Sequence, residues 1–207
     1  MCYMIVFVFF FFIVCAALGV LRRVDRRQRQ MCISGSRKGV LPLKADRVPF
    51  SLKFAYGIGQ LPSGLHGYAV GIFLLFYYNQ VLGLSGTLSG IAIFLSLIVD
   101  AISDPMVGAL SDSTRSRWGR RHPYMYAAAI PFAASFYFLF APPTDLSEME
   151  LFWWLTIFSI STRTFMTFYS VPHMSLGAEL TSDYDERTLL SSVRMVLQLL
   201  GMFAVLI

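Results

Sequence analysis

Two carboxylates lie inside an otherwise apolar stretch of this sequence. Asp100 and Asp104 occur in "IVDAISDPMVGAL", and their spacing of four residues places both on one face of a helix. Carboxylate oxygens are the ligands that small, hard cations prefer. Two close carboxylates can also share a proton. The pattern therefore predicts a site for a small cation or a proton.

A second polar stripe lies farther along the chain. Arg163, Thr167 and Ser170 are spaced at i, i+4 and i+7, so they share one helical face. With about 1.5 Å of rise per residue, Thr167 is expected at the depth of Asp100, and Ser170 at the depth of Asp104. A hydroxyl at the depth of the carboxylates supplies a further oxygen ligand. We therefore expect both stripes to lie at one level of a helical bundle.

Other polar side chains in the apolar stretches are candidates for lining a substrate path. His66 is expected near the membrane midplane, and Arg194 at the depth of Asp104. Ionisable groups inside a membrane cost roughly 2.5 to 3.5 kcal/mol each and usually face a bundle interior. The path candidates are Tyr56, Gln60, His66, Arg163, Ser170, His173 and Arg194.

Each of these groups also has a purely structural interpretation. The acidic pair could be a polar contact between helices, or the partner of Arg163 and Arg194. His66 and His173 could be packing histidines, and the tyrosine and amide candidates could lie at the membrane interface. The sequence leaves both interpretations open.

The surrounding sequence has the composition of a membrane protein. Of its 207 residues, 56% are hydrophobic and 14% are charged, and the mean hydropathy is +0.61. A soluble domain carries about 25% charged residues. Runs of ~17 to 25 apolar residues can cross a bilayer as helices. Six stretches have or approach this length: 2–21, 52–80, 85–110, 124–141, 150–178 and 188–207.

The loops between these stretches differ in charge. The segment "SDSTRSRWGRRH" is strongly basic, whereas "LGLSGT" carries no charge and "PPTDLSEME" is acidic. Basic loops stay on the cytoplasmic side of a membrane. Placing the basic loop inside also puts the basic stretch before Lys53 inside and the two other loops outside. We therefore expect a multi-pass protein of the lipid bilayer, in a plasma membrane or a bacterial inner membrane.

Residues 1–50 form a separate segment in this interpretation. An apolar run is followed by "RRVDRRQRQ" and a polar linker, without the basic start or clear cleavage site of a signal peptide. The segment fits either an additional anchor helix or an upstream extension, and we assign it no function. Residues 51–207 form the second unit.

Several functional classes lack support in the sequence. The bases cluster as they do in cytoplasmic loops and accompany no RNA-binding motif, so we expect no nucleic-acid partner. Cys2, Cys15 and Cys32 show no metal-ligand spacing. We find no nucleophile–base pair and no phosphate loop. We therefore expect neither an enzyme nor a cofactor.

Three segments resemble a known transporter family. "DAISDPMVGALSDSTRSRWGRRHP" resembles its second helix and first cytoplasmic loop, and "YSVPHMSLGAELTSDYDERTLLSSVRM" is similar to its fourth helix, the next loop and the start of its fifth helix. "LKFAYGIGQLPSG" matches its first helix more weakly. The family is the glycoside-pentoside-hexuronide:cation symporters, a melibiose permease-like branch of the major facilitator superfamily. The resemblance covers about residues 51–207.

The resemblance implies an all-α, multi-pass helical bundle. Residues 51–207 would be the first five helices of the N-terminal six-helix half of a twelve-helix transporter. It also implies cation-coupled symport of a sugar or glycoside by alternating access, with the cation bound by Asp100, Asp104 and Thr167. Charged residues at the inner helix ends would form an inner-gate network: Asp112, Arg115, Arg117, Arg120, Arg121, Asp183, Glu186 and Arg187.

Three positions depart from the family pattern. In sugar-transporting relatives, acids in the first and fourth helices hold substrate hydroxyls, whereas this sequence has Gly64 and Ser170 there. Arg163 is the third departure. It predicts either a fixed cation that weakens Na⁺ binding at Asp100 or a partner for an acidic substrate such as a hexuronide.

Two other functions stay open at this point. The sequence ends at Ile207 inside an apolar run, which favours a membrane segment or scaffold that does not transport by itself. We therefore expect the 207-residue chain to need the missing C-terminal helices for transport. The other possibility is a relative that carries a lipid or another amphiphile instead of a sugar.

Overall fold

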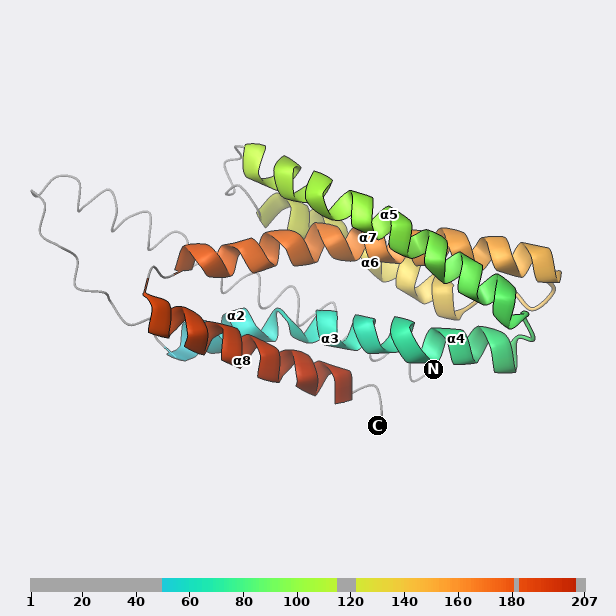
Figure 1. Ribbon diagram of the computed structural model, residues 1–207, viewed down its shortest axis with the longest axis horizontal. Coiled ribbons are helices and arrows are strands. Elements are labelled where there is room, and N and C mark those ends of the chain that lie inside the picture. Colours follow the sequence, from blue (N-terminus) through green and yellow to red (C-terminus); the bar gives the residue numbers. More distant parts are fainter. Residues whose placement is uncertain (1–49, 115–121, 181–182, 204–207) are drawn as a thin grey trace, which may run out of the picture.

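The described part of the chain is built from helices (Figure 1). The computed structural model describes residues 50–114, 122–180 and 183–203, and every regular element within these ranges is helical. The predicted apolar stretch at residues 2–21 lies outside the described residues. Within the described residues, the five other predicted stretches are helical except for the turn at Gly59 and Gln60 and the end residues Ser85 and Ala141. The all-α fold class is confirmed.

The first described span is assembled from short helical segments. They are α2 (Phe50–Ile58), α3 (Leu61–Tyr68), the π turn η1 (Ala69–Phe73), α4 (Leu74–Phe76) and the π turn η2 (Tyr77–Val81). The break between α2 and α3 has a local cause. The Gln60 amide donates to the Gly57 carbonyl in a turn (2.9 Å), and Pro62 lacks the amide that would continue the helix.

Four longer helices make up the rest of the described chain. They are α5 (Gly86–Ser113), α6 (His122–Phe140), α7 (Glu148–Leu180) and α8 (Tyr184–Phe203). The start of α5 is capped by the Ser85 side chain, which accepts a hydrogen bond from the Leu88 amide (3.4 Å). At the start of α7, the amide and hydroxyl of Ser147 donate to Glu150 at 2.8 and 2.6 Å.

Two helices are long and apolar enough to cross a membrane by length and composition alone. They are Gly86–Ser113 and Pro123–Phe140. Large apolar side chains of α5 stay exposed, among them Phe94, Leu97 and Ile102. A soluble monomer rarely leaves such a large contiguous apolar surface open to water, so this surface suits contact with lipid.

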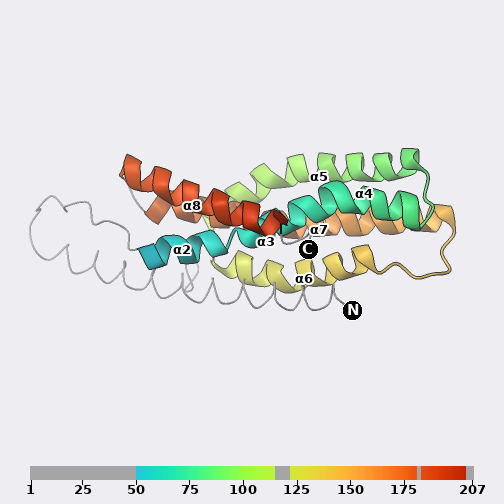
Figure 2. The ribbon, with the colours of Figure 1, turned by 90° about the horizontal axis from the view of Figure 1, so that it is seen from below.

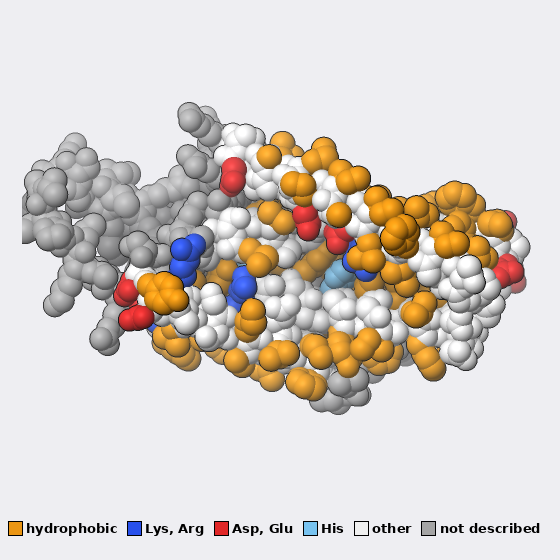
Figure 3. Space-filling view, viewed as in Figure 1, with side chains coloured by type: hydrophobic (Ala, Val, Ile, Leu, Met, Phe, Trp, Pro, Cys, Tyr) orange, Lys and Arg blue, Asp and Glu red, His pale blue; other side chains and the backbone are white. Residues whose placement is uncertain are grey.

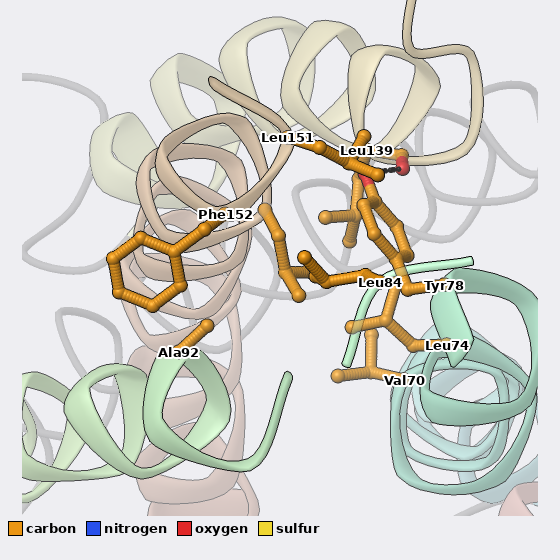
Figure 4. Close-up of a cluster of buried hydrophobic side chains, with 9 residues drawn as sticks. Val70, Leu74, Tyr78, Leu84, Ala92, Leu139, Leu151 and Phe152 are labelled. Atoms are coloured by element: carbon orange, nitrogen blue, oxygen red, sulfur yellow. Dashed lines mark hydrogen bonds between the residues drawn. The ribbon is translucent and has the colours of Figure 1, made fainter. Parts of the chain in front are cut away.

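The helices pack in two groups (Figures 1 and 2). α7 packs along both α5 and α6, whereas α8 packs along α2 and α3. A cluster of buried side chains at the ends near α4 joins the first span to α5, α6 and α7 (Figure 4). There the Tyr78 hydroxyl donates to the Leu139 carbonyl (2.7 Å), which ties the first span to the end of α6.

The contact between α3 and α8 depends on glycine. A Cβ atom at Gly64 would clash with the backbone carbonyl of Gln198, and one at Gly201 would clash with the carbonyl of Leu61. Small residues at helix contacts let membrane helices approach each other closely. The two glycines therefore set the short distance between these backbones.

Candidate cation-binding and transport site

Helices α5 and α7 bring two carboxylates and one hydroxyl together. The Thr167 hydroxyl oxygen lies 3.0 Å from Oδ1 of Asp100 and 2.9 Å from Oδ1 of Asp104. A hydroxyl carries one proton, so it donates to one carboxylate at a time. Thr167 is 4% exposed, Asp100 is half-buried and Asp104 is exposed. Three oxygens from three side chains thus converge, and such a set can hold a small cation.

The sequence of α5 explains how short side chains reach α7. The buried positions of α5 are mostly small, and they are Ser89, Ala92, Ser96, Val107 and Ser111. Asp100 falls on this stripe at helical spacing. Because small residues let two helices approach closely, an aspartate side chain is long enough to meet a hydroxyl on the neighbouring helix. Pro105 follows Asp104 inside α5, and Pro172 lies inside α7, so both helices carry a proline near the site.

Arg163 lies at the edge of this site. Its Nη1 atom is 3.5 Å from Oδ2 of Asp100, and the two side chains are 17% and 28% exposed. Arg163 therefore approaches the Asp100 oxygen that Thr167 does not use. Arg163 is thus a partner of Asp100. This agrees with the Arg163 part of the structural interpretation, which also named Arg194.

A hollow runs beside the acidic site. Figure 3 shows acidic, basic and histidine side chains gathered in it, between α5 and α3. His66 on α3 is 8% exposed, and its ring contacts Phe132 edge-on with ring centroids 5.5 Å apart. These contacts fit the packing interpretation of His66 better than a ligand role. Ser170 on α7 is half-buried.

A second polar cluster lies around the break between α2 and α3. The His173 ring is fully buried between Tyr56 and Tyr169, with ring centroids 4.6 and 5.7 Å apart. The Tyr169 hydroxyl donates to the Gly59 carbonyl (2.5 Å), and the Arg194 side chain lies at the Tyr56 hydroxyl. The structure therefore brings three path candidates, Tyr56, His173 and Arg194, into one cluster.

Gln60, a path candidate, and Gly64, a departure from the family pattern, need separate comment. Gln60 is 4% exposed and forms part of the turn that ends α2. Gly64, the first-helix position at which sugar-transporting relatives were expected to carry an acid, packs against the backbone of α8. A carboxylate does not fit there, so Gly64 does not correspond to a substrate-binding position that lines the hollow.

The inner ends of α2 and α8 are joined by an ion pair that the sequence analysis missed. The Lys53 ammonium lies 2.6 Å from Oε2 of Glu186, and both side chains are largely buried. The sequence held a signal for this pair. Lys53 lies inside an apolar stretch, at the membrane side on which the acidic residue Glu186 is also expected. The Arg187 amide donates to the Asp183 carbonyl (3.0 Å) in the first turn of α8.

The remaining predicted inner-gate residues divide into two groups. Asp112 is exposed near the end of α5. The four arginines lie outside the described residues, and they are Arg115, Arg117, Arg120 and Arg121.

Comparison with known proteins identifies the family. Residues 55–207 match the family model described as MFS/sugar transport protein. The chain belongs to this family. MFS/sugar transport proteins are transporters rather than enzymes and are integral to the plasma membrane or the bacterial inner membrane, and the long, apolar α5 and α6 agree with that location. The recognition of a symporter branch from sequence motifs is confirmed.

Relatives in the MFS/sugar transport family differ in what their names say they carry. The chain is 35% identical over 165 residues to a symporter of Synechocystis, covering 77% of this chain and 30% of that protein. It is 32% identical over 156 residues to the isoprimeverose transporter of Lactiplantibacillus pentosus, covering 75% and 32%. It is also 32% identical over 157 residues to the sodium-dependent lysophosphatidylcholine symporter 1 of Gallus gallus, covering 75% and 29%. The chain spans about a third of the length of these relatives.

Proposed function

We propose that the protein containing this chain is a cation-coupled symporter whose coupling ion is held by Asp100, Asp104 and Thr167. The observation that supports this most directly is the Thr167 oxygen, which lies 3.0 and 2.9 Å from oxygens of the two carboxylates. Ionisable groups inside membrane helices mark ion pathways, because retaining them otherwise costs folding energy. Na⁺ or H⁺ is the ion that such a site would take.

The proposed cycle needs no covalent chemistry. A cation that enters the site neutralises charge on the Asp100 and Asp104 carboxylates and draws α5 and α7 toward one ion. Substrate binding then permits the helical bundle to rock between outward-facing and inward-facing states, as in other transporters of alternating access. In this proposal the buried Lys53–Glu186 pair and the predicted inner-gate charges steady one of the two states.

For the substrate, we propose a sugar or glycoside that reaches the hollow beside α3. The family description and the isoprimeverose-transporting relative support this class. We place Tyr56, Gln60, Ser170, His173 and Arg194 along its path, and His66 keeps the packing role that its contact with Phe132 supports. Because the Gly64 position is closed by α8, recognition of the hydroxyls would depend on neutral and basic side chains rather than on a first-helix acid.

A second candidate substrate is a lysophospholipid-like amphiphile. One relative is named a sodium-dependent lysophosphatidylcholine symporter, and it is as similar to this chain as the isoprimeverose transporter is. Uptake of one substrate of each class separates the two candidates. The full-length protein in proteoliposomes is tested for sodium-driven uptake of radiolabelled isoprimeverose and of lysophosphatidylcholine, and the proposed class is rejected if only the lipid is taken up.

The coupling site itself is tested with acid-to-amide variants. We expect Asp100→Asn and Asp104→Asn to abolish sodium binding by the purified full-length protein, because each removes a charged oxygen ligand. Asp145→Asn is the matched control, since Asp145 is exposed in the loop before α7 and lies outside the site. Sodium binding that survives both site variants at the wild-type level would rule out this assignment.

A further inference from the structure

Arg163 and Thr167 use different oxygens of the same carboxylate. The Arg163 Nη1 atom is 3.5 Å from Oδ2 of Asp100, whereas the Thr167 hydroxyl is 3.0 Å from Oδ1. A tight, charge-assisted hydrogen bond from a guanidinium would measure about 2.7 to 2.9 Å and would often be bidentate. The observed contact is longer and involves one nitrogen. Arg163 therefore places a positive charge beside Asp100 without closing the side on which the three oxygens converge.

The side chains around the site can be counted by charge. Asp100 and Asp104 together carry two negative charges, and a guanidinium keeps its positive charge at all physiological pH values. His66, which packs against Phe132, is counted as neutral at pH 7. The Arg194 side chain lies at the Tyr56 hydroxyl, in the second polar cluster, so its charge is not included in this sum. Among the residues that the structure describes, the side chains counted at the site thus leave a net charge of minus one, the charge that a single monovalent cation neutralises.

The same oxygens without Arg163 would suit a different ion. Two carboxylates and a hydroxyl resemble part of a calcium-binding set, in which several acidic oxygens surround a divalent ion. A fixed positive charge within a few ångströms repels any incoming cation, and it repels a divalent ion twice as strongly as a monovalent one. Arg163 is therefore in a position to affect both how tightly an ion binds and which ions bind.

We propose that Arg163 is a tethered counter-charge that makes the site select a monovalent over a divalent cation and that keeps the binding of this ion weak enough for its release. This inference rests on the proposed cation site. It makes Arg163 a specificity-determining residue rather than a ligand. Of the two roles that the sequence left open for Arg163, it favours the one beside Asp100, because a guanidinium nitrogen lies 3.5 Å from an oxygen of that carboxylate.

The test is a sodium titration of the purified full-length protein with radioactive sodium, with and without calcium chloride. We expect Arg163→Gln to bind sodium roughly tenfold more tightly than wild type, because a nearby positive charge is gone. We also expect calcium to compete with sodium in this variant and not in wild type. Arg163→Lys keeps the charge and should behave as wild type does in both respects.

The sign of the affinity change decides the outcome. If Arg163 only shaped the site, its removal would weaken sodium binding, so a sodium affinity that does not rise in Arg163→Gln overturns the proposal. Calcium that fails to compete in this variant overturns it as well. If the Arg163→Gln protein aggregates during gel filtration, Arg163→Met, which is also neutral, replaces it in the same titration, with the same expected results.

Failure of this inference is distinguishable from failure of the cation site. Sodium binding that is lost in Asp100→Asn but unchanged in Arg163→Gln retains the site and removes the role of Arg163. Sodium binding that persists in both aspartate variants removes the site itself, whatever Arg163 does.

Discussion

Replacing Thr167 with valine isolates the contribution of one oxygen atom to the proposed cation site. Valine keeps the branched shape and removes the hydroxyl that lies 3.0 and 2.9 Å from the Asp100 and Asp104 carboxylates. In the proposed ion-bound state the hydroxyl oxygen offers a lone pair to the cation, and we take the loss of this contact to equal that of one hydrogen bond to a charged group, about 1.5 to 3 kcal/mol. The position is 4% exposed, so water does not readily replace the oxygen. We expect sodium affinity to fall roughly 10- to 100-fold.

The assay is equilibrium binding of radioactive sodium to the full-length protein, and the chain offers a matched control. Thr162 lies on the same helix and is fully buried, but its hydroxyl donates to the Phe158 carbonyl (2.7 Å) and not to a carboxylate. Thr162→Val should therefore bind sodium as wild type does. A Thr167→Val titration that coincides with that of Thr162→Val would refute the ligand role of Thr167.

Two further predictions concern stability, measured by thermal unfolding of the purified protein. Gly64→Ala should cost about 1 to 3 kcal/mol because its methyl group meets the Gln198 backbone, whereas Gly67→Ala faces open space and should not. Equal unfolding of these two variants would contradict the close approach of α3 and α8. Glu186→Gln should cost about 3 kcal/mol because it leaves the buried Lys53 ammonium without its carboxylate, and exchanging the two charges should recover most of the loss. A Glu186→Gln variant as stable as wild type would contradict this.

Much of the fold was predictable because lipid imposes simple rules on sequence. Apolar runs of helical length and the charges of the loops directly indicated α5, α6, α7 and α8. The broken first span was not predictable in the same way. The turn at Gln60 and the two π turns depend on contacts with other helices, such as the Tyr169 hydroxyl that meets the Gly59 carbonyl. From the sequence alone, residues 52–80 form one continuous apolar stretch without a predicted break.

The sequence predicted how deep each site residue lies in the membrane, but not which neighbour its side chain faces. Counting residues along two helices placed Thr167 level with Asp100, and the structure has them in contact. The same count placed Arg194 level with Asp104, whereas its side chain lies at the Tyr56 hydroxyl. Depth follows from the rise of a helix, but the neighbour that a side chain faces depends on how each helix is rotated, and single-sequence spacing does not fix that rotation.

The prolines of α5 and α7 have a mechanical consequence. A proline cannot bond the carbonyl four residues earlier, so Pro105 leaves the Ala101 carbonyl, and Pro172 the Phe168 carbonyl, without the usual intrahelical donor. These two carbonyls lie next to the residues that hold the proposed ion. Each helix thus lacks one backbone hydrogen bond beside the proposed ion site. An ion that binds both helices there would restrict their motion relative to each other while it is bound. Its release would allow each helix to bend again.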